Sequence, residues 1–216
     1  MIPFSGEVFF AVLQDYNLAM WPVHALAYVL AIVIVVLAYH GTAIGGRLIA
    51  AIMAAAWCWL GIGFVDQVFT PLLWASWMLK TAFLVEAGMF AVMAIMPRPI
   101  QIRLAPDNRS WTAGLIFILC AILYPVLAAQ WNHAWPSAQL LGAAPAPTAV
   151  FTIGLLLLAP SRFAKLLAVI PALFLLITAY LGVGLAIWED VLLAAIGLAG
   201  LAIMVFPKLL VESKKQ

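Results

Sequence analysis

The sequence predicts an all-α membrane protein: a single domain over residues 1–216, folded as a polytopic bundle of about seven transmembrane helices. Three observations support this fold class. Only 8% of the residues are charged and 68% are hydrophobic, and a mean hydropathy of +1.18 excludes an ordinary soluble globule. Long uncharged runs alternate with short polar connectors, as expected for helices that each cross a bilayer. Basic residues occupy every second connector, which predicts a fixed orientation in the membrane.

The predicted elements follow the apolar runs in order. Residues 3–16 combine aromatic with acidic side chains and predict a short N-terminal amphipathic helix that lies in the membrane interface. The first span opens with Trp21-Pro22, because proline is tolerated in the first turn of a helix. The fifth span is short unless the preceding connector extends it. The predicted spans are residues 21–39, 47–64, 73–96, 111–128, 148–159, 163–181 and 191–209.

The distribution of lysine and arginine predicts the sidedness of the bundle. These residues follow the first, third and fifth spans and return in the tail, whereas the other four ends hold no lysine or arginine and most of them carry carboxylates. The positive-inside rule therefore places the N-terminus outside and the C-terminus in the cytoplasm. The basic residues of the connectors and the tail are Arg47, then Arg98, Arg103 and Arg109, then Arg162 and Lys165, and finally Lys208, Lys214 and Lys215.

The two ends of the sequence resemble each other. Leu60-Gly61 is echoed by Leu181-Gly182, and Asp66 is matched by Asp190 after a small insertion. The echo predicts two parallel repeats, residues 17–96 and 131–209, joined by a linker helix at 111–128. SWEET transporters use such a 3+1+3 arrangement of parallel repeats, although their Pro-Gln signature does not occur in this sequence. The alternative is coincidence, since Leu, Ala and Gly often match by chance in apolar segments.

The composition argues against several other classes of protein. The net charge of +2 comes from basic residues spread over separate connectors, so no nucleic-acid partner is expected. Cys58 and Cys120 lie in apolar runs without CxxC spacing, which argues against a disulfide framework or a cysteine metal site. The first residues lack the basic region and cleavage site of a secretory signal, so we expect no cleavable signal peptide. No phosphate loop, nucleophile elbow or metalloprotease helix indicates an enzyme.

Lys80 and Glu86 are the most informative polar residues because both fall inside the third predicted span. An ionisable group at membrane depth is costly and normally faces the bundle interior or water. The six-residue spacing does not bring the two side chains face to face, so each is expected to find partners on other helices. The functional interpretation is an ion or substrate path. The alternatives are a structural hydrogen-bond clamp, or a Lys80 that lies near the interface and extends its amine to water.

A second group of polar residues is predicted near the outer face of the membrane. Two imidazoles and three carboxylates could bind a borderline cation such as Zn²⁺, although their spacing is scattered and headgroup-level hydration explains them equally well. A b-type haem would need axial ligands on facing helices, and only His24 and His133 have similar predicted depth. The sequence leaves any metal or cofactor open. The outer-face cluster comprises His24, Asp66, His133, Glu189 and Asp190.

The stretch 130–154 is too irregular for one helix and too apolar for a hydrated loop. Non-helical backbone at membrane depth persists only when it is buried in protein or lines a cavity. The stretch therefore predicts a re-entrant segment that caps the outer mouth of the bundle. The alternative is an ordinary external loop lying on the bundle.

Several short motifs together carry a family resemblance. They are Pro3-Phe4, Phe9-Phe10, Tyr16-Asn17, Trp21-Pro22, Leu123-Tyr124-Pro125, Gly142, Pro145, Pro147-Thr148 and Phe151-Thr152-Ile153-Gly154. Over essentially the whole chain they resemble a bacterial membrane family, domain of unknown function 6064. The resemblance implies a bacterial inner-membrane protein of about this length and no particular reaction. The residue between the two prolines is often Cys in that family but is Ala146 here, so any chemistry of that thiol would be absent.

Two classes of function follow from these observations. The first is a small permease or channel-like protein for a small solute or ion, with Glu86 and Lys80 on the path. The second is an accessory or cofactor-binding subunit of a membrane complex without transport activity. The first predicts a cavity that reaches Glu86 or Lys80, whereas the second predicts a packed core and a lateral surface mated to a partner. The lipid bilayer is the expected partner in both cases, together with a second copy or another membrane protein.

Overall fold

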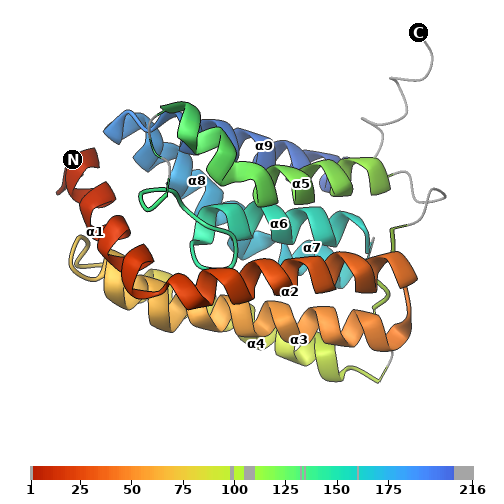
Figure 1. Cartoon of the computed structure of the whole chain (residues 1–216). Helices are drawn as coiled ribbons and strands as arrows, with labels where there is room; N and C mark the ends of the chain where they lie inside the picture. Colours follow the sequence, from red (N-terminus) through yellow and green to blue (C-terminus); the bar gives the residue numbers. More distant parts are fainter. Residues whose placement is uncertain are drawn as a thin grey trace, which may run out of the picture.

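The computed structural model describes residues 2–97, 100–104, 110–131, 133, 135–159 and 161–206. Within these residues the protein is built from helices and contains no β-strand element, which confirms the all-α prediction (Figure 1). The helices are α1 (Gly6–Ala19), α2 (Trp21–His40), α3 (Ala43–Trp59), η1 (Leu60–Phe69), α4 (Ser76–Ile95), α5 (Trp111–Ala128), η2 (Ala129–Trp131), α6 (Pro145–Leu157), α7 (Arg162–Leu167), α8 (Val169–Leu185) and α9 (Trp188–Val205).

Within the described ranges, six helical units are long and apolar enough to cross a membrane. They are α2, α3 with η1, α4, α5 with η2, α7 with α8, and α9. These helices run roughly parallel along the bundle, and α1 lies across one end of it (Figure 1). The prediction of a polytopic helical bundle is therefore confirmed.

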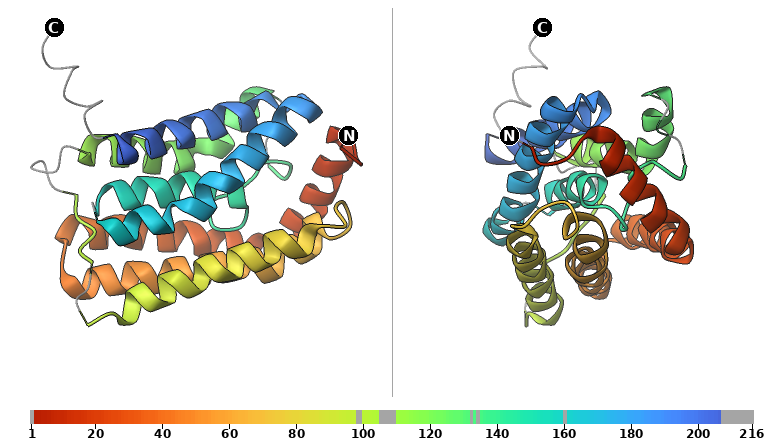
Figure 2. Two further views of the ribbon diagram at one scale, coloured as in Figure 1. Left: turned by 180° about the vertical axis from the view of Figure 1, so that it is seen from behind. Right: turned by 90° about the vertical axis from the view of Figure 1, so that its left-hand side faces the viewer.

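The fifth predicted span differs from the other six. It is the 13-residue helix α6, which covers only about 20 Å at 1.5 Å per residue. An irregular loop before it, residues 135–144, occupies the remaining height of the bundle, so loop and helix together make the crossing (Figure 2). The fifth crossing is thus half loop and half helix.

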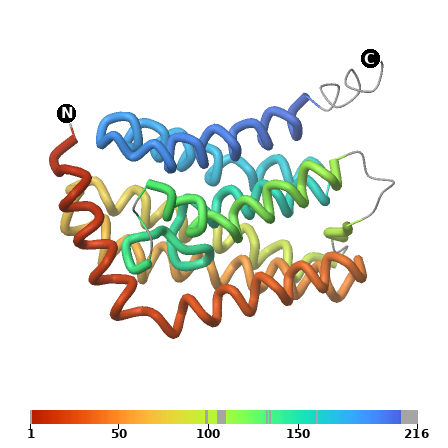
Figure 3. Tube along the Cα trace, turned by 45° about the horizontal axis from the view of Figure 1, so that its top comes forward, coloured from red at the N-terminus to blue at the C-terminus, as the bar shows by residue number. Residues whose placement is uncertain are grey.

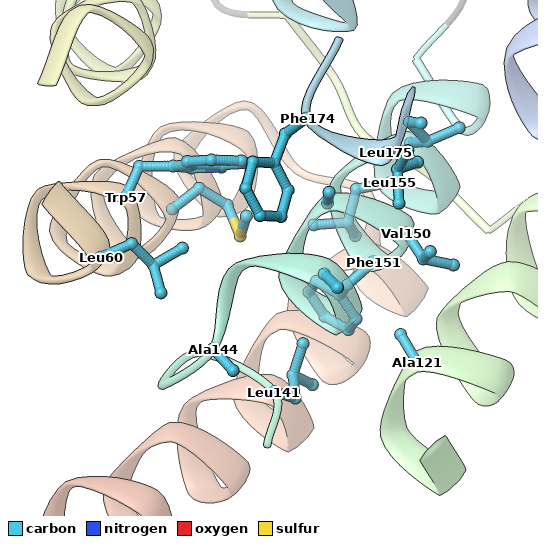
Figure 4. Close-up of a cluster of buried hydrophobic side chains, with 14 of the residues drawn as sticks. Trp57, Leu60, Ala121, Leu141, Ala144, Val150, Phe151, Leu155, Phe174 and Leu175 are labelled. Carbon is cyan, nitrogen blue, oxygen red and sulfur yellow. The ribbon is translucent and has the colours of Figure 1, made fainter. Parts of the chain in front are cut away.

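Helix α6 is the centre of the molecule. All thirteen of its residues are buried, and the surrounding helices enclose it (Figure 2). A helix that is apolar on every side is stable only when it is packed on every side. In Figure 4, Val150, Phe151 and Leu155 of α6 lie among buried side chains that include Trp57 and Phe174 from neighbouring helices.

The sequence leaves few unpaired amide groups at the buried N-terminus of α6. The first four amide groups of a helix have no partner inside the helix, and leaving them unpaired away from water is costly. Pro145 and Pro147 have no amide hydrogen, and the amide of Ala144 donates to the Leu140 carbonyl at 2.7 Å. Of the four amide positions at the start of α6, only Ala146 has an amide hydrogen that these features do not account for. The Pro-x-Pro-Thr stretch therefore allows a helix to start inside the bundle.

Thr148 completes the same turn. Its hydroxyl donates to the Ala144 carbonyl at 2.6 Å and accepts from the Gly142 amide at 2.8 Å. Gly142 has φ +76°, and a Cβ there would lie 2.7 Å from Ala27 of α2. Only glycine permits both this left-handed backbone and this close approach. The loop is consequently a compact structure packed against α2, and whether it is re-entrant stays a prediction.

The second span extends to Phe69 as a π-helix, five residues beyond its predicted end. The Thr70 amide bonds the Val65 carbonyl at 2.8 Å, the i to i−5 pattern of a π-helix. Such wide turns are rare and occur often at functional sites. The consequence here is that Asp66 lies inside this helix and not in the connector after it.

Helix α1 lies at one end of the bundle, and α9 ends at the opposite end (Figure 3). We name them the α1 end and the α7 end. Opposite ends agree with an odd number of crossings, but which end faces the cytoplasm stays a prediction from the basic residues. Of those residues, Arg98, Arg109, Lys208, Lys214 and Lys215 lie outside the described part of the chain, as does the predicted end of the last span at 209.

The parallel 3+1+3 repeat also stays a prediction. The positions that match in sequence differ in local structure, since Asp66 lies in the π-helix η1 whereas Asp190 lies in the first turn of α9. Likewise, α2 is a full span of 20 residues whereas its counterpart is the half-helix α6.

Candidate functional site

Glu86 lies half-way along α4 on the face that points into the bundle. Its side chain is fully buried at 0% exposure. Phe83 and Phe90, one turn away on either side, are buried on the same face. The Phe83 ring in turn packs edge-on against Trp57 and Phe174, each at 5.2 Å between ring centroids. The carboxyl group therefore sits on an aromatic, apolar face at the middle of the membrane span.

Neither oxygen of Glu86 has a hydrogen-bond partner among the residues that the structure describes. The polar contact expected from the sequence is thus missing in this conformation. Burying an ionised carboxylate without a partner costs many kcal/mol, so the group must carry a proton or bind a cation. This makes Glu86 unlike the other buried carboxylates of the bundle.

Lys80 lies apart from Glu86, near the α1 end of the bundle. It is in the second turn of α4, and its amine forms an ion pair with Asp66 of η1 at 2.6 Å. Both side chains are partly exposed, at 36% and 43%. The pair therefore joins α4 to η1 at the level where a lysine side chain can reach water.

Asp190 forms the best satisfied buried site in the bundle. It lies in the first turn of α9, where the helix dipole favours a negative charge. The hydroxyl of Tyr124 from α5 donates to one carboxylate oxygen, and the amide of Gln139 from the loop donates to the other at 2.7 Å. These hydrogen bonds tie α5, the loop and α9 together.

The neighbouring carboxylate, Glu189, pairs with His133. Glu189 is buried, whereas the imidazole is partly exposed and stacks on Phe10 of α1 with ring centroids 3.8 Å apart. These contacts connect α1, through His133, to the start of α9. We refer to Tyr124, His133, Gln139, Glu189 and Asp190 as the carboxylate network.

Helix α1 also holds the loop through Tyr16 and Asn17. The Tyr16 hydroxyl donates to the Ala143 carbonyl at 2.9 Å and accepts from the indole of Trp59 at 3.0 Å. Burial raises the pKa of the Tyr16 phenol to about 12, and the hydrogen bond from Trp59 lowers it by less. The Asn17 amide donates to the carbonyls of Pro136 and Ala138. The α1 helix therefore acts as a clamp on the loop.

His24 is buried close to this clamp. Its ring packs edge-on against Tyr16 at 6.1 Å and against Trp135 at 5.4 Å. Neither ring nitrogen has a hydrogen-bond partner within the described residues. An imidazole in this setting is a packed interior group with one unused donor and one unused acceptor.

The predicted outer-face cluster divides into three places. His133, Glu189 and Asp190 belong to the carboxylate network, Asp66 pairs with Lys80, and His24 packs between Tyr16 and Trp135. No group of three or more His, Cys, Asp or Glu residues among those described could hold a metal ion. His133 is already paired with Glu189, so the geometry gives no support for a haem held by the two imidazoles.

A cavity of about 300 Å³ lies between α2 and α3, and its lining includes Leu26 and Ala55, which are exposed on the surface of these two helices. Gly142 and Thr148 of the fifth crossing form its inner wall. Its remaining walls are almost wholly apolar. They comprise Val23, Leu26, Ala27, Leu30, Ala31 and Ile34 from α2, Ile52, Met53, Ala55, Ala56 and Trp59 from α3, and Leu141 and Phe151. We name this space the lateral pocket.

Sequence reasoning missed the neutral partners of the buried carboxylates. Tyr124 and Gln139 carry no charge, so composition and spacing gave them no weight. Tyr124 and Tyr16 do occur in the motifs of the family resemblance, which was the one signal available for them. Tyr124 bonds Asp190, 66 residues away in the chain, and Tyr16 bonds Ala143, 127 residues away. No local sequence pattern reveals contacts between residues so far apart.

The fold and these sites define the class: a helical multi-pass membrane protein with a discontinuous central crossing. Within that class the chain belongs to DUF6064, a family of unknown function, whose model matches residues 6–215. No curated protein matches the chain, and no solved structure does.

Proposed function

We propose that this protein is a small permease or channel-like protein of the bacterial inner membrane, and that Glu86 binds the proton or cation that crosses. The observation that carries the proposal is a fully buried carboxyl group at mid-membrane without a hydrogen-bond partner among the described residues. Ionisable groups at this depth are expensive and are retained chiefly where they act on ions or substrates.

The discontinuous fifth crossing supports the proposal. Transporters commonly form their sites where a helix is interrupted near the membrane midplane, because irregular backbone there lines a cavity. Here α6 starts inside the bundle, and η1 adds a second departure from regular α-helix. The analogy concerns architecture alone, so the role of Glu86 must be tested directly.

The conformation described is a closed one under this proposal. The lateral pocket is lined by α2, α3 and the fifth crossing and does not include Glu86 of α4. A second cavity lies at the α7 end, also away from Glu86. Transport would require α4 to move relative to α3 and η1, which exposes the carboxyl group to water on one side at a time.

The test is an ion-flux assay in proteoliposomes with entrapped pH-sensitive or Na⁺-sensitive dye and an imposed membrane potential. We expect flux of one of the two ions above that of empty liposomes, and a loss of about tenfold or more in Glu86→Gln. Asp66→Asn is the matched control, because it removes a carboxylate that is partly exposed and already paired. Equal flux in the wild type, in Glu86→Gln and in empty liposomes would refute the proposal.

A second candidate function rests on the lateral pocket. The protein would be a non-transporting subunit that holds a lipophilic cofactor and contacts a membrane partner or a second copy through its outer surface. A pocket of about 300 Å³ with apolar walls has the size and chemistry of a small-ligand site. Its exposed lining residues, Leu26 and Ala55, belong to two candidate membrane spans, so such a ligand would enter from the bilayer.

This alternative predicts a bound molecule that copurifies with the protein. Ala56→Phe fills the pocket, whereas Ala51→Phe adds the same bulk on the exposed side of α3. Mass spectrometry of an organic extract should find one lipophilic compound in the wild type and Ala51→Phe and a reduced amount in Ala56→Phe. An equal amount of the compound in the wild type and in both variants would exclude the lateral pocket as its binding site.

A further inference from the structure

A second cavity lies at the α7 end of the bundle, where α5 begins and where α6 and α9 end. Its volume is about 270 Å³. It combines two cations and two hydroxyl groups with an apolar floor. The lining residues are Ser110, Leu156, Leu157, Ser161, Arg162, Ala164, Lys165, Ile203 and Met204. We name this cavity the basic pocket.

The two charged side chains that line the basic pocket, Arg162 and Lys165, are both positive. Arg162 and Lys165 are exposed, and neither forms an ion pair within the described part of the chain. The described carboxylate residues lie elsewhere: Glu7 and Asp15 in α1, Asp66 in η1, Glu86 at mid-span, and Glu189 and Asp190 at the start of α9. An anion would therefore find attraction at this pocket and no described carboxylate to repel it.

The apolar floor restricts what kind of anion fits. Leu156, Leu157, Ile203 and Met204 line the cavity beside the two cations. A free phosphate gains nothing from such surface, whereas a phospholipid can place its phosphate on the cations and its first methylenes on the leucines. The position at the ends of α6 and α9 is also the level of the headgroups if these helices span the bilayer.

We propose that the basic pocket binds one anionic phospholipid, with its phosphate held by Arg162 and Lys165. The guanidinium of Arg162 offers a planar pair of donors to two phosphate oxygens, and the amine of Lys165 adds a point charge. Basic pockets between transmembrane helices recognise anionic headgroups in this way. The bound lipid would join α5, α6, α7 and α9 at this end of the bundle and is independent of any role of Glu86.

The experiment uses the full-length protein in mixed micelles of phosphatidylglycerol and phosphatidylcholine, with retained lipid measured by native mass spectrometry. The wild type should retain phosphatidylglycerol over phosphatidylcholine, and Arg162→Gln with Lys165→Gln should lower that preference by about tenfold. The matched control, Arg47→Gln with Arg103→Gln, removes the same charge from the same end but outside the pocket, and should keep the preference.

Two further arms make each outcome decisive. Arg162→Lys with Lys165→Arg keeps the charge and should retain the lipid, which separates loss of binding from loss of folding. Excess inorganic phosphate should displace little phosphatidylglycerol, because it cannot use the apolar floor. An equal loss of preference in both double glutamine variants would overturn the proposal, since it would indicate general surface charge. Full displacement by inorganic phosphate would overturn it in favour of a free-anion site.

Discussion

Asp190 and Glu86 are both buried carboxyl groups, yet the protein treats them in opposite ways. Asp190 lies in the first turn of a helix and accepts hydrogen bonds from Tyr124 and Gln139. Glu86 lies in the middle of a helix, where the backbone amides are already used, and its oxygens have no partner among the described residues. The first arrangement is that of a structural joint. The second leaves a buried carboxyl group unpaired, and under the proposed function its partner is the proton or cation that crosses.

The comparison teaches that burial alone does not assign a role to an ionisable residue. What distinguishes the two is whether neighbouring elements offer donors. A satisfied network rigidifies the elements that it joins, whereas an unsatisfied group costs free energy until something binds to it. The two carboxyl groups should therefore respond to substitution with opposite signs, which the following predictions test.

The largest effect is expected for Asp190→Ala. It leaves the Tyr124 hydroxyl and the Gln139 amide buried without an acceptor, and we expect a loss of about 3 kcal/mol in the free energy of unfolding. The thermal midpoint in detergent should fall clearly. In the double variant with Tyr124→Phe the losses should not add, because both changes break one interaction. An unchanged midpoint would mean that the carboxylate network does not hold the bundle.

Tyr16 provides a pH-dependent measure of the same region. Its pKa is raised from 10.0 to about 12 by burial, so the folded state holds the phenol proton more tightly than the unfolded state. This contribution to stability is complete below pH 10 and disappears as the pH rises to about 12, a loss of about 2 kcal/mol. Chemical unfolding at several pH values should detect it. In Tyr16→Phe the decline over this range should be smaller, and an identical decline would contradict the assignment.

Glu86→Met should act in the opposite direction. An apolar side chain of similar size removes the cost of an unpaired carboxyl group, so stability should stay the same or rise by about 1 kcal/mol. The thermal midpoint is again the measurement, with Asp190→Leu as the control that should destabilise. A marked fall in the thermal midpoint of Glu86→Met would show that the carboxyl group has a structural partner. The contrast drawn between Glu86 and Asp190 would then fail.

The smallest effect is expected for Lys80→Met. The pair with Asp66 is more than one-third exposed, and such ion pairs contribute about 0.5 kcal/mol or less. The midpoint should shift little, and the shift should shrink further at high salt. A loss as large as that of Asp190→Ala would place this ion pair among the structural joints of the bundle.

The sequence by itself determined the class of fold. Apolar runs of membrane length and their connectors predicted the six long helices within a few residues, because helix formation in lipid depends on local composition. The same reasoning located the fifth crossing and its irregular approach, since Pro145 and Pro147 are readable without a structure. The predicted depth of Glu86 in the third span was also enough to identify it as a buried ionisable residue.

Only the tertiary structure decided which charges are satisfied. Helix α4 is apolar on nearly all sides, so its sequence does not reveal that Glu86 shares a buried face with Phe83 and Phe90. Likewise, nothing local indicates that Tyr124 meets Asp190, because their contact depends on how α5 and α9 pack. The outer-face residues separated into three places for the same physical reason. Hydropathy fixes the depth of a side chain in the membrane, whereas packing fixes its direction around the helix axis.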